Sequence, residues 1–359
     1  MKVLYFSPVE WNWIKQRPHF MAEALASEGN EVHFCSRSPW GKKAFWSKFR
    51  QESEKLLIRD FTVLTCALRF PWIEKWNARS LRKILFRENY DAVVLTDPRL
   101  VTILPGPEEF QTPVIYECMD RNSYFYEGKL REQIRKREEQ LCRRAAAIVV
   151  SSNALKTILQ EDFSVPPEKI TVIRNAVADN LLDKVQINAQ EPVDLLYAGT
   201  IDHWFDWDPV LAFARRNPGR KIRIVGPAAV SPKKLPENIE MYGSVPHSEI
   251  PGLLQNASVL IMPFHPNDLI RAVDPVKMYE YLTFGKPVIA SYWEELEFFR
   301  GNKNLYFYHE PEEFSAHAER LLETEAAWTA DKAFLQANSW SKRGHEFNML
   351  LKTLADKPE

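Results

Sequence analysis

The chain has 359 residues, of which 45% are hydrophobic and 26% charged, and its formal net charge is −1. This length supports two hydrophobic cores, and the near-neutral charge gives no general reason to expect a nucleic-acid partner. The four cysteines lack the close paired spacing of a metal site, and no apolar run is long enough for a signal peptide or a membrane span. We therefore expect a cytoplasmic protein without metal or cofactor, either soluble or peripheral on the inner face of the plasma membrane.

Short apolar runs alternate with helical patterns in the first half of the chain, which predicts a mostly parallel sheet covered by helices. The predicted strands are 3–6, 31–35, 92–95, 114–116, 147–150 and 170–173, and the clearest predicted helices are 17–27 and 129–144.

The loop after the first strand lies where open α/β sheets bind ligands, beyond the carboxyl ends of the strands. It contains no glycine, which argues against a dinucleotide-binding fingerprint and a nicotinamide enzyme. Trp11, Trp13, Arg17 and His19 could line an acceptor pocket, with the rings stacking on a sugar or lipid. The alternative is that these side chains pack the following helix against the sheet.

Residues 37–90 are basic and rich in aromatic side chains. They contain thirteen Lys and Arg against five Asp and Glu, a net charge of +8. Such a composition fits a surface that lies on anionic lipid headgroups. It also fits binding of single-stranded nucleic acid, which we disfavour because no nucleic-acid motif accompanies it, or an ordinary helical layer whose aromatic side chains are core.

The predicted strand 114–116 runs into acidic residues at its carboxyl end, where catalytic groups of such sheets belong. Asp120 is the candidate general base, and Glu117 is less favoured because it can still lie within the strand. The alternative for Asp120 is a turn residue that bonds backbone amides.

A polar stretch up to Pro192 reads as a linker, and a second α/β series follows it. Its predicted elements are strands 195–198, 222–225, 239–242 and 259–263 and a helix over 208–216. We expect an N-terminal domain over 1–178, completed by a C-terminal helix at about 338–359, and a C-terminal domain over 190–337. Two α/β halves joined in this way predict a ligand cleft between them.

Residues 271–291 predict a loop, a helix, a tight turn and a buried strand. Asp274 can cap a helix over about 275–284, and Gly285 suits the left-handed residue after its last turn. Lys277 and Glu280 are three residues apart on one helix face. They could hold a ligand with phosphate and hydroxyl groups, or form a solvated salt bridge.

The order and spacing of these motifs resemble the C-terminal half of GT-B glycosyltransferases. The resemblance rests on Gly199-Thr200, Ile224 to Pro227, Asn238 to Gly243, Leu253 to Pro263 and, above all, Pro275-x-Lys277-x-x-Glu280-Tyr281-x-x-x-Gly285-Lys286-Pro287-Val288. Trp204 to Trp207 and Arg17-Pro18-His19 are similar to the bacterial group that includes teichuronic-acid biosynthesis glycosyltransferases, and Lys277 resembles its counterpart in the xanthan-pathway glucuronosyltransferase.

The resemblance implies two Rossmann-like domains facing across a cleft, with a terminal helix that crosses back to the first domain. It implies that Glu280 bonds the nucleotide ribose and that Lys277 neutralises the diphosphate, whose leaving oxygens gain negative charge. The other implied donor-binding residues are Gly199, Thr200, Gly226, Met262, Pro263 and Val276.

Two departures concern the stereochemistry. Retaining members usually carry a Glu eight positions before the ribose-binding one, where this chain has Ala272, and an Arg and a Lys where this chain has 201–205. Both favour inversion, in which Asp120 deprotonates the acceptor. Arg271 could meet a donor carboxylate, or be a solvated arginine.

The sequence thus predicts a metal-independent inverting transferase that moves a sugar from a nucleotide donor, UDP-linked in the simplest case, to a lipid-linked or polysaccharide acceptor. The alternatives are a retaining transferase, a nucleotide-sugar 2-epimerase of the same fold, and a non-catalytic binding module. The tail from Pro311 to Lys352 is predicted to be helical.

Overall fold

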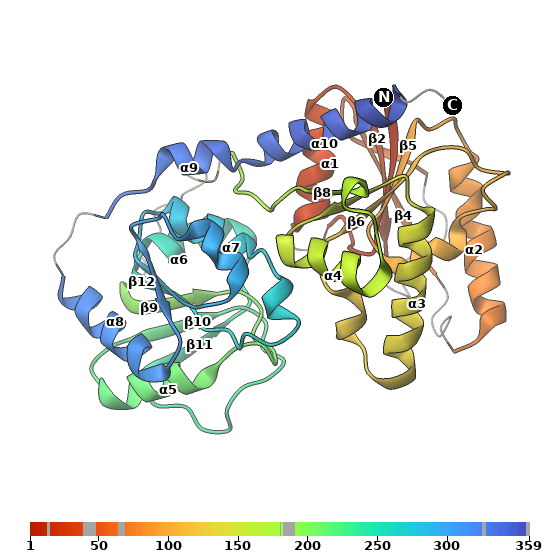
Figure 1. The fold of residues 1–359 in the computed structure, drawn as a ribbon. Coiled ribbons are helices and arrows are strands. Elements are labelled where there is room, and N and C mark those ends of the chain that lie inside the picture. The colour runs from red at the N-terminus through yellow and green to blue at the C-terminus, as the bar shows by residue number, and fades with distance from the viewer. Residues whose placement is uncertain are drawn as a thin grey trace. The chain divides into compact units, whose positions relative to one another are not determined.

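The computed structural model describes residues 1–12, 15–38, 48–63, 69–179, 181, 191–324 and 328–356. The chain divides into two compact units (Figure 1). The N-terminal unit comprises Met1–Arg174 and Trp340–Glu359, and the C-terminal unit comprises Asn175–Ser339. Most of the predicted linker, 180 and 182–190, lies outside the described residues.

The described part of the N-terminal unit contains an eight-stranded sheet in the order β3-β4-β2-β1-β5-β6-β7-β8. All neighbouring strands pair in parallel except β3 with β4. The strands are β1 (Lys2–Ser7), β2 (Glu31–Arg37), β3 (Arg50–Ser53), β4 (Leu56–Phe61), β5 (Ala92–Leu95), β6 (Val114–Cys118), β7 (Ala147–Val150) and β8 (Ile170–Val172). Continuous apolar runs such as Ala92–Leu95 are buried throughout, as a sheet covered on both faces requires.

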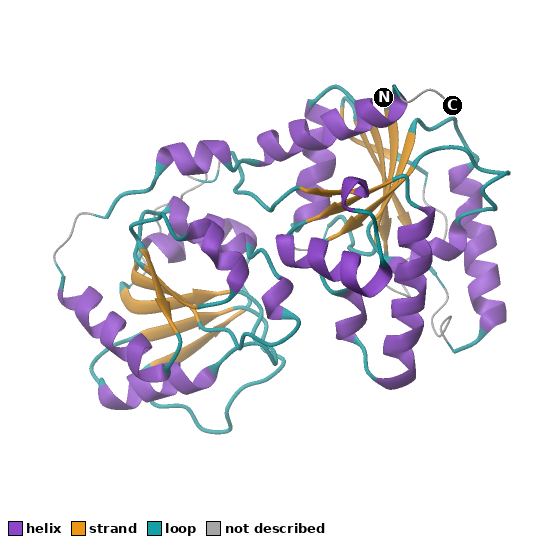
Figure 2. Ribbon diagram, in the orientation of Figure 1, coloured by secondary structure: helices purple, strands orange, loops and turns teal. Residues whose placement is uncertain are grey.

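Helices enclose this sheet (Figure 2). They are α1 (Arg17–Ser27), α2 (Pro71–Leu85), α3 (Gly128–Arg144), α4 (Asn153–Phe163) and α10 (Trp340–Ala355), with short 3-10 turns η1 (Pro98–Ile103), η2 (Asn122–Phe125) and η3 (Pro167–Lys169). The limits of α1 agree with the predicted helix 17–27.

The C-terminal helix α10 packs on α1 of the N-terminal unit (Figure 1). A Cβ at Gly344 would lie 2.5 Å from the Cβ of Ala24, so a glycine permits the close approach. The rings of Phe20 and Trp340 stack with centroids 5.1 Å apart, and Asn348 accepts a hydrogen bond from Asn30. The expected return of the last helix to the first domain is confirmed.

The described part of the C-terminal unit contains a six-stranded parallel sheet in the order β11-β10-β9-β12-β13-β14. The strands are β9 (Val193–Ala198), β10 (Ile222–Val225), β11 (Ile239–Gly243), β12 (Ala257–Met262), β13 (Val288–Ser291) and β14 (Leu305–Tyr308). The helices are α5 (Trp207–Arg216), α6 (Ile250–Gln255), α7 (Val276–Thr283), α8 (Pro311–Glu323) and α9 (Lys332–Ala337), with 3-10 turns η5 (His247–Glu249), η6 (Ile270–Ala272) and η7 (Glu294–Phe299). Within the described residues, the predicted helical tail forms three helices, α8, α9 and α10. None of the helices in the described ranges is long and apolar enough to cross a bilayer.

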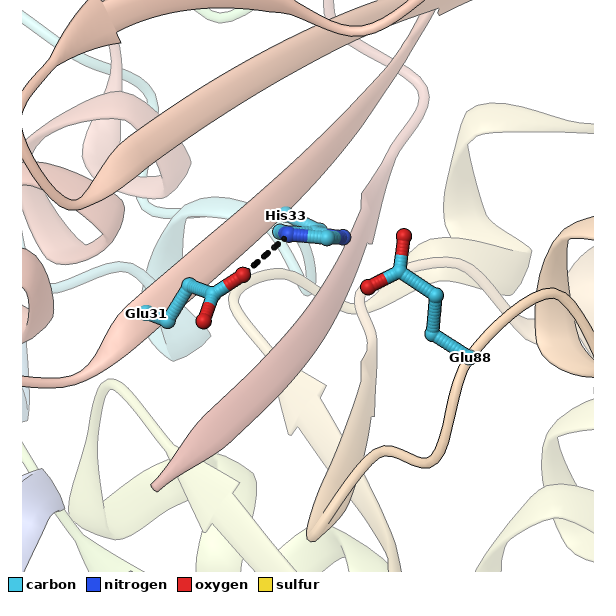
Figure 3. A group of neighbouring side chains, drawn as sticks. All are labelled: Glu31, His33 and Glu88. Carbon is cyan, nitrogen blue, oxygen red and sulfur yellow. Dashed lines mark hydrogen bonds and ion pairs between the residues drawn. The ribbon is translucent and has the colours of Figure 1, made fainter.

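A cluster at the amino-terminal edge of the first sheet contains Glu31, His33 and Glu88, whose ligand atoms lie within 4.8 Å of one another (Figure 3). The ammonium of Lys2 lies 3.1 Å from Glu31 and also pairs with Glu88. Since the ammonium of Lys2 already pairs with both carboxylates and His33 hydrogen-bonds Glu31, we interpret the cluster as a polar network that joins the ends of β1 and β2.

Candidate functional site

Helix α7 carries the predicted donor motif, and its start differs from the prediction. The helix begins at Val276 with Pro275 as its N-cap residue, so Asp274 is not the cap. Asp274 is buried, and its carboxylate accepts hydrogen bonds from the backbone N–H of Asn175 at 2.6 Å and from the hydroxyl of Tyr279. A buried carboxylate needs such donors, and these lie inside the unit rather than on the helix end.

The turns after β9 and β10 approach each other closely. A Cβ at Gly226 would lie 2.0 Å from the carbonyl oxygen of Gly199, and Gly226 has a φ of +134°. The backbone N–H of Gly199 donates to the carbonyl of Val225 at 2.8 Å. A side chain at Gly226 would separate the two turns, so a glycine is required there.

Lys277 lies directly over Gly199. A Cβ at Gly199 would lie 1.8 Å from Cε and 2.7 Å from Nζ of Lys277. The first turn of α7 therefore delivers its ammonium to the carboxyl end of β9, which is the edge where open α/β sheets bind ligands.

The ammonium of Lys277 and the carboxylate of Glu280 are half-buried, and no ion pair or hydrogen bond joins the two side chains. Burial lowers the pKa of Lys277, and the charge of Glu280 opposes this. Burial raises the pKa of Glu280, and Lys277 opposes that. The solvated salt bridge considered from the sequence is not present, so both charged groups remain available to a ligand.

Two tyrosines to which the sequence pattern assigned no role hold the turn beside Lys277. The hydroxyl of Tyr281 accepts from the backbone N–H of Ala198 at 2.8 Å, and the hydroxyl of Tyr197 donates to the carbonyl of Thr200 at 2.8 Å. Tyr281 follows Glu280 directly in the motif, which is the one signal that could have marked it.

The remaining predicted donor residues differ in exposure. Thr200 is exposed and Val276 half-buried, while Met262 and Pro263 are buried at the end of β12. The side chain of Met262 is core, so any contact of this segment with a ligand must use its backbone. Ala272 is buried, and the exposed Arg271 donates to the carbonyl of Pro266 at 2.9 Å.

Asp120 lies beyond the carboxyl end of β6 in the N-terminal unit, as predicted, and is half-buried. Burial raises its pKa to about 6, and the nearby Arg17 opposes this rise. Glu117 lies inside β6 and is fully buried. Its carboxylate accepts from Nε of Arg17 at 2.8 Å and from the hydroxyl of Tyr5. Glu117 is thus bonded within the core, which leaves Asp120 as the candidate base.

The predicted acceptor residues are largely internal. Trp11 and His19 are buried, with ring centroids 5.1 Å apart, and His19 also contacts the ring of Phe34. Arg17 is buried against Glu117. Their burial favours the alternative reading, packing of the helix against the sheet. Trp13 lies outside the described residues.

The described part of the basic segment 37–90 forms β3, β4 and α2. Helix α2 buries an apolar face that includes Ile73 and Leu81. Trp72, Trp76 and Phe70 are exposed, with 67% of Trp72 accessible to solvent. These three aromatic side chains are therefore not core, whereas Trp40, Phe45 and Trp46 lie outside the described residues.

Two family models match the chain one after the other. The model described as Glycosyltransferase Family 4 matches residues 19–181, and the model described as Glycosyl transferase-like matches residues 208–348. The chain is 26% identical over 200 residues to TuaH of Bacillus subtilis, whose name describes a teichuronic acid biosynthesis glycosyltransferase. The match covers 50% of each chain, so the chain aligns with about half the length of this relative.

Solved structures share the whole fold. A glycosyltransferase from Rickettsia africae superimposes with a TM-score of 0.70 at 15% identity, covering 99% of both chains. A Listeria monocytogenes structure described as a UDP-N-acetylglucosamine 2-epimerase gives a TM-score of 0.59 at 13% identity, covering 100% of this chain and 97% of the other. The resemblance to GT-B glycosyltransferases is confirmed: two glycosyltransferase family models each match one part of the chain, and solved glycosyltransferases share its fold.

Proposed function

We propose that this chain, which has the fold and the family matches of GT-B glycosyltransferases, transfers a sugar from a nucleotide-sugar donor to an acceptor in cell-surface glycan biosynthesis. The observation that carries the proposal is the ammonium of Lys277 over Gly199, with Glu280 beside it and no ion pair between them. A cation and a carboxylate held in this way complement a diphosphate and a ribose, the two polar parts of a UDP-linked donor.

Donor binding is assigned to the C-terminal unit. Lys277 neutralises the diphosphate, and Glu280 accepts hydrogen bonds from the ribose hydroxyls. The turns at Gly199-Thr200 and Gly226 leave room for the ligand to approach the backbone, and the segments at Met262-Pro263 and Val276 border it. Lys277 also favours departure of the nucleoside diphosphate, because a fixed cation stabilises the negative charge that develops on the leaving oxygen.

Acceptor activation is assigned to Asp120 in the N-terminal unit. Its carboxylate takes the proton of an acceptor hydroxyl while that oxygen attacks the anomeric carbon. The bond from the anomeric carbon to the phosphate oxygen breaks in the same step, and the nucleoside diphosphate leaves with the bonding electrons. This chemistry inverts the anomeric configuration and uses no metal, which agrees with Ala272 in place of the carboxylate typical of retaining members.

The acceptor is proposed to be lipid-linked, or a polysaccharide, at the inner face of the membrane. Support comes from α2, where Trp72 and Trp76 are exposed among basic residues. Aromatic rings favour the interface between headgroups and acyl chains, and lysines and arginines are attracted to anionic lipids.

Screening nucleotide sugars by thermal shift tests the donor assignment, because a ligand that binds only the folded form raises its stability. We expect a UDP-sugar to raise Tm in the wild type and much less in Lys277→Ala. Equal shifts in both proteins would refute the role of Lys277. Turnover should then require an added acceptor and give the inverted anomer.

The main alternative is a nucleotide-sugar 2-epimerase, which shares the fold. Incubating the donor alone distinguishes the two activities. An epimerase converts the donor into an isomeric nucleotide sugar without acceptor, whereas the transferase leaves it unchanged. Binding without turnover for every acceptor tested would instead indicate a binding module.

A further inference from the structure

Four arginines lie at the carboxyl edge of the N-terminal sheet or in the segment that follows it, the edge beyond which Asp120 also lies. Arg37 ends β2, Arg99 follows β5 in η1, and Arg121 follows β6. Arg131 lies in the first turn of α3, directly after that loop. Strands β2 and β5 flank β1, so their carboxyl ends are two strand spacings, about 10 Å, apart. Arginine side chains span such a gap.

Arg37 and Arg99 form the first pair. Arg99 is held by Asp97, whose carboxylate accepts from the backbone N–H of Arg99 at 2.8 Å and from its Nε at 2.9 Å. Arg37 is half-buried; burial lowers the pKa of its guanidinium, the charge of Arg99 adds to this, and the charge of Asp97 opposes it. The phenolic oxygen of Tyr126 interacts electrostatically with both guanidinium groups.

Arg121 and Arg131 form the second pair, on the ring of Tyr124. Their guanidinium carbons lie 3.7 and 3.5 Å from the ring centroid. Arg121 also approaches the carboxylate of Asp162 at 3.6 Å. Since Tyr124 and Tyr126 belong to one short loop, the two arginine pairs border the same stretch of surface.

The charges of this cluster are not balanced. Asp97 and Asp162 pair with Arg99 and Arg121, and the charge of Asp97 also acts on Arg37, but neither Arg37 nor Arg131 forms an ion pair with a carboxylate in the part of the chain that the structure describes. Holding like charges together costs free energy that an anion would offset. Arginine is suited to phosphate because its planar group donates two parallel hydrogen bonds.

We propose that Arg37, Arg99, Arg121 and Arg131 form a binding site for a phosphoryl group of the acceptor. The inference rests on the proposed transferase function, and it identifies the acceptor as a phosphorylated one. The arginines would hold the phosphate beside Asp120, where the acceptor hydroxyl is deprotonated. The phosphate could belong to a lipid diphosphate carrier or to a free phosphorylated glycan.

Calorimetry in a Lys277→Ala background tests the site, because the proposed donor site has then lost the cation that would also bind a diphosphate. The probes are farnesyl diphosphate, inorganic pyrophosphate and uncharged farnesol. The variants are Arg37→Gln and Arg131→Gln, with Arg216→Gln, an exposed arginine at the end of α5, as the matched control.

We expect each site variant to weaken diphosphate binding about tenfold, the effect of one lost charged hydrogen bond, and Arg216→Gln to leave it unchanged. The affinity for uncharged farnesol should not differ between the site variants and the control. Tighter binding of farnesyl diphosphate than of pyrophosphate identifies a lipid carrier, and equal binding identifies a phosphorylated glycan. Unchanged affinity in both site variants would overturn the proposal, and if Arg37→Gln fails to fold, Arg131→Gln decides alone.

Titration of the same arginine variants with UDP, in the chain that keeps Lys277, separates this inference from the donor assignment. Unchanged UDP affinity is expected. An equal loss for UDP would assign the arginines to the donor and overturn the acceptor site. If no nucleotide sugar binds the wild type but the arginine variants still lose diphosphate, the proposed donor site fails while the phosphate site stands.

Discussion

Gly199→Ala is the sharpest probe of the donor site, because it adds one methyl group under Lys277. The new Cβ would lie 1.8 Å from Cε and 2.7 Å from Nζ of the lysine. Carbon atoms approach to about 3.5 to 4.0 Å, so the lysine must withdraw by roughly 2 Å. That displacement exceeds the tolerance of a hydrogen bond and removes the ammonium from the diphosphate.

The expected loss follows from the energy of one charged hydrogen bond, about 1.5 to 3 kcal/mol, which weakens UDP-sugar binding by about 10- to 100-fold. The blocking atoms are the ends of the Lys277 and Tyr197 side chains, but Gly199 has a φ of +158°, which residues with a Cβ rarely adopt, so Tm of the free protein should fall and the affinity is measured on folded protein below that Tm. Calorimetric titration with a UDP-sugar measures the affinity. Gly128→Ala is the matched control, because Gly128 also has a positive φ, +53°, and a Cβ there meets nothing within 4 Å.

A double-mutant cycle shows whether Gly199→Ala acts through the lysine. If it does, the double variant with Lys277→Ala should bind donor no more weakly than Lys277→Ala alone. Additive losses would place the effect of the methyl group elsewhere. Wild-type affinity in folded Gly199→Ala would refute the argument that Lys277 over Gly199 holds the donor.

Three further predictions concern other groups. Asp120→Asn should lower kcat at least 100-fold with donor affinity unchanged. In the wild type, kcat/KM should rise as pH passes about 6, because the carboxylate of Asp120 must be ionised to act as a base. A pH profile that is flat between pH 5 and 7 would contradict this role. Glu138 is buried in α3, accepts from Tyr116 at 2.6 Å, and burial raises its pKa to about 7. The free energy of unfolding should therefore fall by roughly 3 kcal/mol as pH rises from about 4.5 to 7. In Glu138→Gln, the free energy of unfolding measured by chemical denaturation should depend less on pH over this range. Trp72→Ala with Trp76→Ala should abolish sedimentation with anionic vesicles at low salt, and unchanged sedimentation would remove α2 as the contact.

The sequence alone determined the fold class and the position of the donor motif. Alternating apolar runs and helical patterns predicted the parallel sheets because the core faces of strands and helices impose their periods on the chain. Proline and glycine placed the limits of the helix at 275–284 within a residue or two, since Gly285 adopts a φ of +62°. Spacing alone also brought Lys277 and Glu280 onto one face of that helix.

Only the tertiary structure decided which polar side chains already have hydrogen-bond or ion-pair partners within the protein. The spacing of Lys277 and Glu280 predicts a surface salt bridge. Packing instead places the lysine over Gly199. Glu117 and Asp120 are three residues apart, yet the first is bonded within the core by Arg17 and Tyr5 and the second is only half-buried.

The arginine cluster likewise depended on strand order. Arg37 and Arg131 are distant in sequence, and they border one loop because crossover connections bring the carboxyl ends of parallel strands to one edge. Local physics sets each helix and turn, whereas partners are set by contacts between residues far apart in the chain. For Lys277, the partner that matters is a glycine 78 positions earlier, which no local pattern indicates.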